Sequence, residues 1–272
     1  MHDKRRVTLR GVSESLLIPL YYRALETRRP DALLRDETAA ALIETLDYDF
    51  SRFKASDQAA TMIRAREFDR LTRAFLVTHP AGAVVDIGGG LDTRFARVDN
   101  GQVDWYCLDF PEVIALRREL LKENEGERYH LLAGSALDFV WFDSLRSSPT
   151  RAILFLAEGV FPYFQEADVR RLILALKDRF PGSEVVFDAM TPLMRWLHNL
   201  ELMAMRVNAR LNWAVKEDRE LEEWGEDIRL REAWHYFDRP EPRLGFSNLF
   251  RYLPPLGKGA KILHYQLGEA IA

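Results

Sequence analysis

Hydrophobic positions along this chain follow two different periods. Up to residue 79 they recur about every 3.6 residues, as in "ESLLIPLYYRALETRR" (14–29), "DETAAALIETL" (36–46) and "DQAATMIRAREFDRLTRAFLVTH" (57–79). That period is typical of helices that bury one face. Asp36 precedes the second stretch and is of a residue type that caps helix N-termini. The pattern therefore predicts a helical leader over residues 12–79.

From residue 82 to residue 190, short apolar, β-branched or aromatic runs alternate with helical stretches. The runs are "AVVDI" (83–87), "VDWYCLD" (103–109), "RYHLLAG" (128–134), "AILFLAEG" (152–159) and "EVVFDAM" (184–190). The helical stretches between them are "PEVIALRRELLKEN", "LDFVWFDSL" and "EADVRRLILALKDRF". Such alternation is typical of βαβ units that build a mostly parallel sheet. Because the runs are apolar on both faces, we expect helices to cover both sides of the sheet.

The remaining residues predict a cap and two edge strands. Residues 190–224 have a helical pattern and hold four of the six methionines and three of the six tryptophans. "IRLREAWHYF" and "AKILHYQL" alternate as strands do, and we expect them to lie antiparallel at the far edge of the sheet. The fold class is α/β, with about seven strands. We expect one domain over 1–272, divided into a helical leader (1–80), a core (81–190), a helical insertion (190–227) and edge strands (228–272).

Composition and charge exclude several classes of function. The chain has 272 residues, 47% of them hydrophobic, and a formal net charge of -4, so it has no basic field to attract nucleic acid. Cys107 is the only cysteine, which excludes an intramolecular disulfide and fits a reducing compartment. We find no signal peptide, no membrane span and no paired histidine spacing for a metal. The expected location is the cytoplasm.

A glycine loop after the first predicted strand indicates a ligand site. The strand contains Asp86, and Gly88, Gly89 and Gly90 follow it, so the backbone can approach a ligand at the carboxyl end of a parallel strand. Asp109 ends the next strand about twenty residues later. At that spacing, nucleotide-binding α/β folds place a carboxylate on ribose hydroxyls. The spacing therefore indicates an adenosine-type ligand.

Charge in this loop favours one adenosine-type ligand over another. Dinucleotides bind a G-x-G-x-x-G loop, whereas this loop has Thr93 at the third glycine position and a carboxylate at Asp92. S-adenosylmethionine carries a sulfonium and an ammonium and no phosphate. Carboxylates at Asp86 or Asp92 are compatible with these cations, so the loop favours S-adenosylmethionine over NAD.

Several segments together carry a family resemblance. "GGGLDTRF", "YCLDFPEVIALRR", "LAEGVFPYF" and "FPGSEVVFDAM" resemble the leucine carboxyl methyltransferase superfamily, and within it the tetracenomycin-type polyketide O-methyltransferases of bacteria. The resemblance covers nearly the whole chain, including "YYRALETRRPDALLRD" and "IRAREFD". It implies a Rossmann-like class I methyltransferase fold, S-adenosylmethionine as cofactor and transfer of a methyl group to oxygen.

The resemblance also assigns roles to residues. It implies that Gly88 and Gly90 line the methionine part of the cofactor and that Asp109 holds the ribose hydroxyls. Arg64, or alternatively Arg66, matches the arginine that binds the cofactor's carboxylate, a role that suits a guanidinium group. Glu158 matches the glutamate near the methionine ammonium.

The adenine contact departs from the family pattern. Many members carry an Asp-Leu pair after the third strand, where this chain has "GSALDFVW". Ser135 occupies this stretch, and Asp138 would supply the carboxylate from a shifted position. The expected cofactor site therefore comprises eight residues: Arg64, Asp86, Gly88, Gly90, Asp109, Ser135, Asp138 and Glu158.

The catalytic base stays open at this point. Methyl transfer from a sulfonium is an in-line displacement in which proximity and orientation dominate. A carboxylate acceptor needs no base, whereas a phenol gains from one. The candidates are Tyr163, His198, His235 and His264, and no motif selects among them.

The leading hypothesis is an S-adenosylmethionine-dependent O-methyltransferase that acts on a carboxyl or hydroxyl group of a small, apolar or polyketide-like acceptor. Residues 190–224 are the expected acceptor cover, because methionine and aromatic side chains adapt to flat apolar ligands. Three alternatives stay open: a methyltransferase for a protein C-terminus, an NAD-linked oxidoreductase and a non-catalytic binding module. The sequence does not indicate an oligomeric state.

Overall fold

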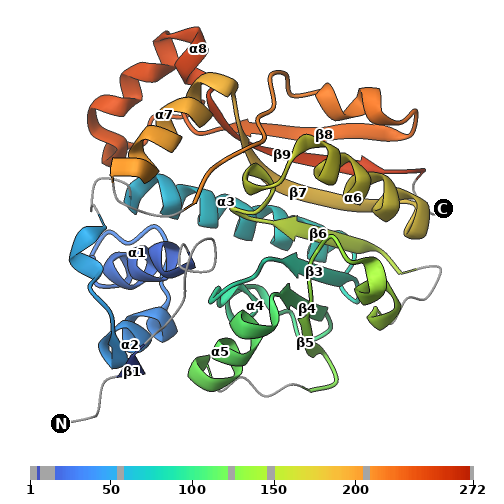
Figure 1. The fold of residues 1–272 in the computed structure, drawn as a ribbon, viewed down its shortest axis with the longest axis horizontal. Helices are drawn as coiled ribbons and strands as arrows, with labels where there is room; N and C mark the ends of the chain where they lie inside the picture. Colours follow the sequence, from blue (N-terminus) through green and yellow to red (C-terminus); the bar gives the residue numbers. More distant parts are fainter. Residues whose placement is uncertain are drawn as a thin grey trace.

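The protein forms an α/β sandwich in which helices cover both faces of one large sheet (Figure 1). The computed structural model describes residues 5–6, 16–53, 58–121, 126–145, 151–204 and 209–269. The strands of the large sheet are β3 (Ala83–Ile87), β4 (Asp104–Asp109), β5 (Tyr129–Ala133), β6 (Ile153–Ala157), β7 (Ser183–Met190), β8 (Ile228–His235) and β9 (Ala260–Leu267). Their spatial order is β5-β4-β3-β6-β7-β9-β8.

Five strands of the sheet are parallel, and the last two form an antiparallel edge. β5, β4, β3, β6 and β7 pair in parallel, whereas β9 pairs antiparallel with both β7 and β8. A β-bulge between Leu230 and Glu232 interrupts the outer pairing. The predicted α/β class, the strand count and the antiparallel edge are confirmed.

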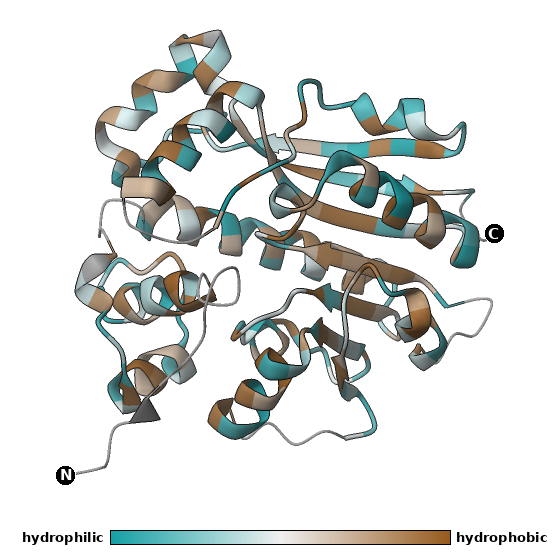
Figure 2. Cartoon of the chain, viewed as in Figure 1, coloured by the Kyte–Doolittle hydropathy of each residue, from teal (hydrophilic) through white to brown (hydrophobic). Residues whose placement is uncertain are grey.

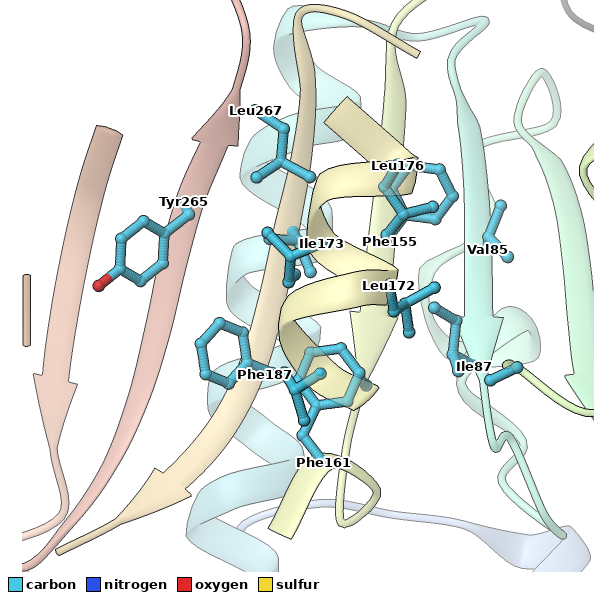
Figure 3. Close-up of a cluster of buried hydrophobic side chains, with 14 of the residues drawn as sticks. Val85, Ile87, Phe155, Phe161, Leu172, Ile173, Leu176, Phe187, Tyr265 and Leu267 are labelled. Atoms are coloured by element: carbon cyan, nitrogen blue, oxygen red, sulfur yellow. The ribbon is translucent and has the colours of Figure 1, made fainter. Parts of the chain in front are cut away.

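Alternate residues of each central strand enter two separate cores. In β3, Val85 and Ile87 enter one core and Val84 enters the other. In β6, Phe155 faces the first core, where Figure 3 shows it beside Leu172 and Leu176 of the helix α6 (Glu166–Arg179). Because both faces of the strands are buried, their sequence is apolar throughout, and Figure 2 shows the central strands as largely hydrophobic.

The helices divide between the two faces of the sheet. α6 and the 3₁₀ helix η4 (Phe139–Ser144) pack on the face that carries Phe155. The other face carries α3 (Gln58–Thr78), α4 (Arg94–Val98) and α5 (Pro111–Leu121). Other helical segments are α7 (Pro192–Ala204), α8 (Pro254–Gly257) and the 3₁₀ helices η2 (Phe50–Arg52), η5 (Phe161–Tyr163), η6 (Glu220–Trp224) and η7 (Pro242–Tyr252).

The N-terminal helices lie beyond the carboxyl ends of the parallel strands, on the left of Figure 1. They are α1 (Leu17–Thr27) and α2 (Glu37–Thr45), and α2 leads into the short strand β2 (Leu46–Asp47), which pairs with β1 (Arg5–Arg6). The expected helix cap is confirmed, because the Asp36 carboxylate accepts a hydrogen bond from the Ala39 N–H (2.9 Å). These helices bury their own apolar cluster and do not extend the sheet core.

One predicted helix is partly wrong. The pattern over 190–224 predicted continuous helix, but only α7 and η6 form among its described residues, and residues 209–219 are non-helical. In that segment Leu211, Trp213 and Val215 are buried at every second position. The backbone N–H of Trp213 donates to the Pro162 carbonyl (3.1 Å), and that of Val215 donates to the Met190 carbonyl (2.9 Å). An extended segment along the sheet satisfies this period-two pattern better than a helix.

No helix among the described residues is long and apolar enough to span a bilayer. In the same part of the chain, no three histidine, cysteine, aspartate or glutamate side chains gather as metal ligands would. Cys107 carries a thiol that is buried in the second core.

Candidate functional site

A cavity of about 250 Å³ opens at the carboxyl ends of the parallel strands. Its walls come from α1, α3, the loops after β3, β4, β5 and β6, the helix η5 and α7. Of the predicted cofactor residues, six line this cavity: Arg64, Asp86, Gly88, Gly90, Asp109 and Glu158. The parallel sheet brings these residues together, because its strands all end at one edge.

The glycine loop has the backbone that its sequence predicted. Gly88 has φ of 68° and Gly90 has φ of 51°, in the left-handed region that favours glycine. The Gly88 N–H donates to the Leu108 carbonyl (2.7 Å), which holds the loop against β4. A Cβ at Gly88 would lie 2.5 Å from Cγ2 of Val160. Only glycine therefore fits at position 88, where the backbone forms the cavity wall.

Asp109 ends β4 and holds the loop as well as facing the cavity. Its Oδ2 accepts the Gly90 N–H (2.8 Å), and its Oδ1 accepts the Phe110 N–H (2.7 Å). Burial raises the pKa of this carboxyl, and the two backbone hydrogen bonds oppose that shift. A carboxylate has about four lone-pair positions, so it can accept two further hydrogen bonds, such as those of a ribose diol.

Two buried arginines hold the carbonyl side of the loop. Arg117 of α5 donates through Nη1 to the Gly90 carbonyl (2.8 Å) and through Nη2 to the Asp92 carbonyl (2.5 Å). Arg23 of α1 donates to the Leu91 carbonyl (2.7 Å). With its carbonyls and N–H groups bonded in this way, the loop backbone has one fixed shape where it forms the cavity wall. Neither arginine was predicted from the sequence, since both lie in helical patterns that show only an amphipathic face.

Asp92 does not act as the sequence analysis expected. Its carboxylate lies 2.8 Å from Nη1 of Arg94 and 3.2 Å from Nη2 of Arg97. Burial raises the pKa of this carboxyl, but Arg94, Arg97 and Arg23 outweigh burial and hold the pKa well below its usual range. The loop charge is therefore neutralised by arginines, and Asp92 no longer distinguishes S-adenosylmethionine from NAD. The physical reason is that α4, which carries Arg94 and Arg97, begins directly after the loop, and that α1 brings Arg23 to the same carboxylate.

Arg64 and Arg66 lie on different sides of α3, and of the two only Arg64 lines the cavity. Arg64 lines the cavity, and its Nε donates to Oε1 of Glu158 (2.9 Å) while its Nη1 donates to Oδ2 of Asp188 (3.1 Å). Arg66 has a side chain that is 44% exposed and lies 3.6 Å from Glu241, outside the cavity. Two residues apart on a helix correspond to about 200°, so only one of the two can face the site.

Glu158 lies between two guanidinium groups. Besides its contact with Arg64, it accepts a hydrogen bond from Nη2 of Arg94 (2.5 Å), and Arg94 is also bound to Asp69 (2.8 Å). Burial raises the pKa of nearby Asp188, which accepts the Gly159 N–H and faces Arg64. The cofactor end of the cavity is therefore a network of alternating charges that is preorganised by α3, α4 and β7.

Asp86 places a buried carboxyl in the wall of the cavity. This carboxyl lies beneath Gly89, where a side chain has no room because a Cβ would lie 2.9 Å from Oδ2 of Asp86. Burial raises the pKa of Asp86 to about 7, against the opposing field of Arg94. Asp86 therefore titrates near neutral pH.

The expected adenine contacts are the weakest match. Gly134 and Ala136 line the cavity, whereas Ser135 and Asp138 do not. The Ser135 hydroxyl accepts the Leu137 N–H (3.2 Å), and the exposed Asp138 accepts the Val140 N–H (3.4 Å) at the start of η4. Both side chains stabilise the turn after β5, so the structure does not support the predicted role of either one.

The part of the cavity wall that α1, η5 and α7 contribute with their flanking residues is mostly apolar. Its apolar residues include Leu16, Ile18, Pro19, Val160, Phe164 and Leu202, of which Leu16 and Val160 lie beside the glycine loop. Tyr163 and His198 also line it, and Nδ1 of His198 lies 3.5 Å from Oε2 of Glu201. Of the other histidine candidates, His235 pairs with Asp218 and His264 with Glu184, both outside the cavity. The structure thus leaves Tyr163 and His198 as candidates beside the acceptor space.

Comparison with known proteins gives the family. Residues 17–177 match the family model for leucine carboxyl methyltransferases. The tetracenomycin polyketide synthesis O-methyltransferase TcmP of Streptomyces glaucescens is 34% identical over 237 residues, which are 86% of this chain and 86% of that protein. The S-adenosyl-L-methionine-dependent methyltransferase dpfgK of Gibberella zeae is 30% identical over 253 residues, 85% of this chain and 84% of that protein.

A solved structure supports the fold. The crystal structure of a putative methyltransferase from Thermobifida fusca superimposes with a TM-score of 0.59 and covers 93% of this chain and 95% of that one, at 18% identity. The strand order, the glycine loop and the acidic end of β4 agree with the match to the family model. The chain belongs to the leucine carboxyl methyltransferase family.

Proposed function

We propose that this protein transfers the methyl group of S-adenosylmethionine to a carboxyl or hydroxyl oxygen of a small, apolar, polyketide-like acceptor. One observation carries the proposal: a single cavity joins the predicted cofactor residues of the sheet edge to an apolar space beneath α1 and α7. Both reactants must meet in one space for an in-line displacement, in which positioning supplies much of the rate enhancement.

The residues at the sheet edge fit the cofactor. Gly88 leaves a wall that a Cβ would obstruct, and Asp109 offers a carboxylate at the position typical for ribose hydroxyls. Arg64 would bind the cofactor's carboxylate, and Glu158 would bind its ammonium group. Each side chain would give up part of its contact with the other and contact the ligand instead. When bound, S-adenosylmethionine supplies an electrophilic methyl group beside a sulfonium.

Asp86 adds a second electrostatic argument for a cationic cofactor. Its carboxyl is buried in the cavity wall with a pKa of about 7. A sulfonium or ammonium nearby would favour the ionised form of this carboxyl, whereas a pyrophosphate would favour the protonated form. With Asp92 neutralised by arginines, Asp86, near the end of β3 and beneath the loop, is the carboxyl that favours S-adenosylmethionine.

The acceptor space supports an apolar substrate with one polar group. Leu16, Ile18 and Leu202 surround it, and Tyr163 and His198 are its polar neighbours. For a carboxylate acceptor, these two groups would orient the oxygen through hydrogen bonds. For a phenol, His198 beside Glu201 is the candidate to accept the proton. The names of the Streptomyces and Gibberella relatives agree with this proposal, since both describe methyltransferases.

The test is methyl transfer to a panel of acceptors. The purified protein is incubated with methyl-labelled S-adenosylmethionine and with aromatic polyketide-like acids, their methyl esters and the corresponding phenols. If the free acids become labelled and mild alkali releases the label, the target is a carboxyl group. If the phenols become labelled and the label resists alkali, the target is a hydroxyl group. Label only on a peptide C-terminus would favour the protein-directed alternative. If the protein binds the cofactor but transfers no label to any acceptor, a non-catalytic binding module would explain the result better.

Variants of the acceptor space sharpen this test. At least one of the variants Tyr163→Phe and His198→Ala is expected to change the rate or the KM for the acceptor by tenfold or more. The affinity for the cofactor should stay unchanged in both variants. His264→Ala is the matched control, because this histidine pairs with Glu184 outside the cavity. The cytoplasmic location and the lack of nucleic-acid and membrane partners stay predictions.

A further inference from the structure

Exposed apolar side chains of this protein gather on two adjacent helical segments. Of the twelve large hydrophobic side chains that are exposed in the described residues, nine belong to α7, to η7 and to the residue that follows η7. They are Leu193, Trp196, Leu197, Leu200 and Met203 on one side and Phe246, Leu249, Tyr252 and Leu253 on the other. We call this set the α7–η7 patch. Figure 2 shows hydrophobic residues along both segments.

The two halves of the patch are neighbours in space. η7 leads directly into α8, and α8 contacts α7. On α7 the five exposed residues follow helical spacing, so they form one stripe along the helix. The opposite side of α7 carries His198, Glu201 and Leu202, which line the cavity. α7 therefore has an inner face toward the acceptor space and an outer apolar face toward solvent.

The size of the patch matches that of a stable interface. Exposed fractions range from 39% for Leu197 to 88% for Phe246. With about 200 Å² for each side chain, the patch offers roughly 1,000 Å² of exposed area per chain, whereas a standard protein interface needs about 800 Å² per partner. Exposed apolar patches on soluble monomers are rarely larger than a few hundred Å².

Charge argues against a membrane as the occupant. Helices that lie on anionic lipid carry several free lysines or arginines on their polar face. α7 has one arginine, Arg195, which donates to the Asn212 carbonyl. The two arginines of η7 are also engaged, Arg243 with Glu26 and Arg251 with the Phe237 carbonyl. α7 and η7 contain no lysine, and each of their arginines is thus bonded within the chain.

We propose that the α7–η7 patch binds a second copy of this chain, as a two-fold dimer in which the α7 helices pack against each other. An amphipathic helix stripe is self-complementary when two copies pack antiparallel, and two-fold dimers are the commonest protein assembly. Each copy would cover the outer face of the partner's α7 and would thereby hold the inner face of that helix over the acceptor space.

The test is the mass of the full chain in solution, measured by sedimentation equilibrium over a range of concentrations. The expected mass of the wild-type protein is twice the 31.6 kDa of one chain. Leu200→Glu and, separately, Phe246→Glu are expected to weaken association at least 100-fold. Val77→Glu and Val140→Glu are matched controls, because Val77 (82% exposed) and Val140 (72%) lie outside the patch. Association in these controls should change by less than threefold.

Folding is checked separately, by circular dichroism and thermal melting of each variant. Two patch variants in different segments keep the test decisive if one of them does not fold, and Trp196→Glu is the replacement in that case. A wild-type protein that stays monomeric up to about 100 µM would overturn the proposal. A dimer that every folded patch variant retains would overturn it as well. Monomeric protein that sediments with anionic vesicles would identify the patch as a membrane surface instead.

Discussion

The guanidinium group of Arg117 donates to the carbonyl oxygen of Gly90 across 2.8 Å, and this contact fixes the loop that forms the floor of the cavity. The same side chain reaches the Asp92 carbonyl and the Tyr129 hydroxyl (3.0 Å). Arg117 thus connects α5, β5 and the glycine loop. The loop is held by side chains from outside the motif, and the motif alone does not explain its shape.

Arg117→Met is expected to destabilise the protein and to weaken cofactor binding together. The substitution leaves two buried loop carbonyls without donors, which costs about 3 kcal/mol of unfolding free energy. Denaturant unfolding and cofactor titration measure the two effects. Arg170→Met, at an exposed position of α6, is the control and should change the unfolding free energy by less than about 0.5 kcal/mol. Equal stability of the two variants would contradict this account of the loop.

Gly88→Ala and Gly101→Ala separate backbone strain from loss of the site. Both glycines have positive φ, 68° and 79°, so alanine costs about 1–2 kcal/mol at either position. A Cβ at Gly101 has nothing within 4 Å, whereas one at Gly88 collides with Val160 in the cavity wall. We therefore expect both variants to lose stability but only Gly88→Ala to lose cofactor affinity, by tenfold or more. A similar affinity loss in Gly101→Ala would show that general destabilisation is the cause.

Arg64→Met and Arg66→Met test which arginine serves the cofactor's carboxylate. Arg64 lines the cavity, and Arg66 lies outside it. We expect Arg64→Met to weaken S-adenosylhomocysteine binding at least tenfold, because a charge-assisted contact is lost. Affinity for 5′-methylthioadenosine, which lacks the amino-acid part, should change less than threefold. If both ligands lose affinity equally, Arg64 serves only the shape of the site.

Asp86 predicts a specific pH dependence of stability. The folded-state pKa of about 7 lies above the ordinary value of 3.8. Between these values the folded protein holds a proton that the unfolded chain has released, so the contribution of this group to stability falls as pH rises through that window. An asparagine at this position does not titrate, so this loss is absent in Asp86→Asn. The unfolding free energy of Asp86→Asn minus that of wild type is therefore expected to rise by up to ~4 kcal/mol between pH 4 and pH 8.

Thermal melting of both proteins from pH 4 to pH 8 measures this difference. Asp178→Asn, at a side chain that is 73% exposed, is the control for the loss of an acidic group. A constant offset between wild type and Asp86→Asn across the range would contradict the raised pKa.

The sheet was predictable because each central strand is buried on both faces and so appears as an unbroken apolar run. β3 and β6 are such runs, and their ends place Asp86 and Glu158 at one edge. The extended segment around Trp213 was missed because one helical pattern was assigned to the whole of residues 190–224, although Leu211, Trp213 and Val215 alternate at period two. That alternation was the signal that sequence reasoning needed.

The charge network was not predictable, because its members are distant in sequence. Asp36 illustrates this: the expected helix cap also accepts from Arg23 (2.7 Å) and from the Thr93 hydroxyl (2.7 Å). The neutralisation of Asp92 likewise depends on how α1, α3 and α4 pack. A sequence shows the charge at each position but not the partner of that charge. For this reason the prediction that Asp92 favours a cationic ligand was wrong. Strand spacing does not depend on such partners, and it correctly placed Asp109 at the cavity.

Calorimetric titration tests the central claim, that this site binds S-adenosylmethionine through Asp109. Wild type, Asp109→Ala and the exposed control Asp178→Ala are each titrated with S-adenosylmethionine, S-adenosylhomocysteine and NAD. We expect wild type and the control to bind the first two ligands and not NAD, and Asp109→Ala to bind them about 30-fold more weakly, which corresponds to ~2 kcal/mol. Binding of NAD alone, or equal affinity in Asp109→Ala and wild type, would contradict the account.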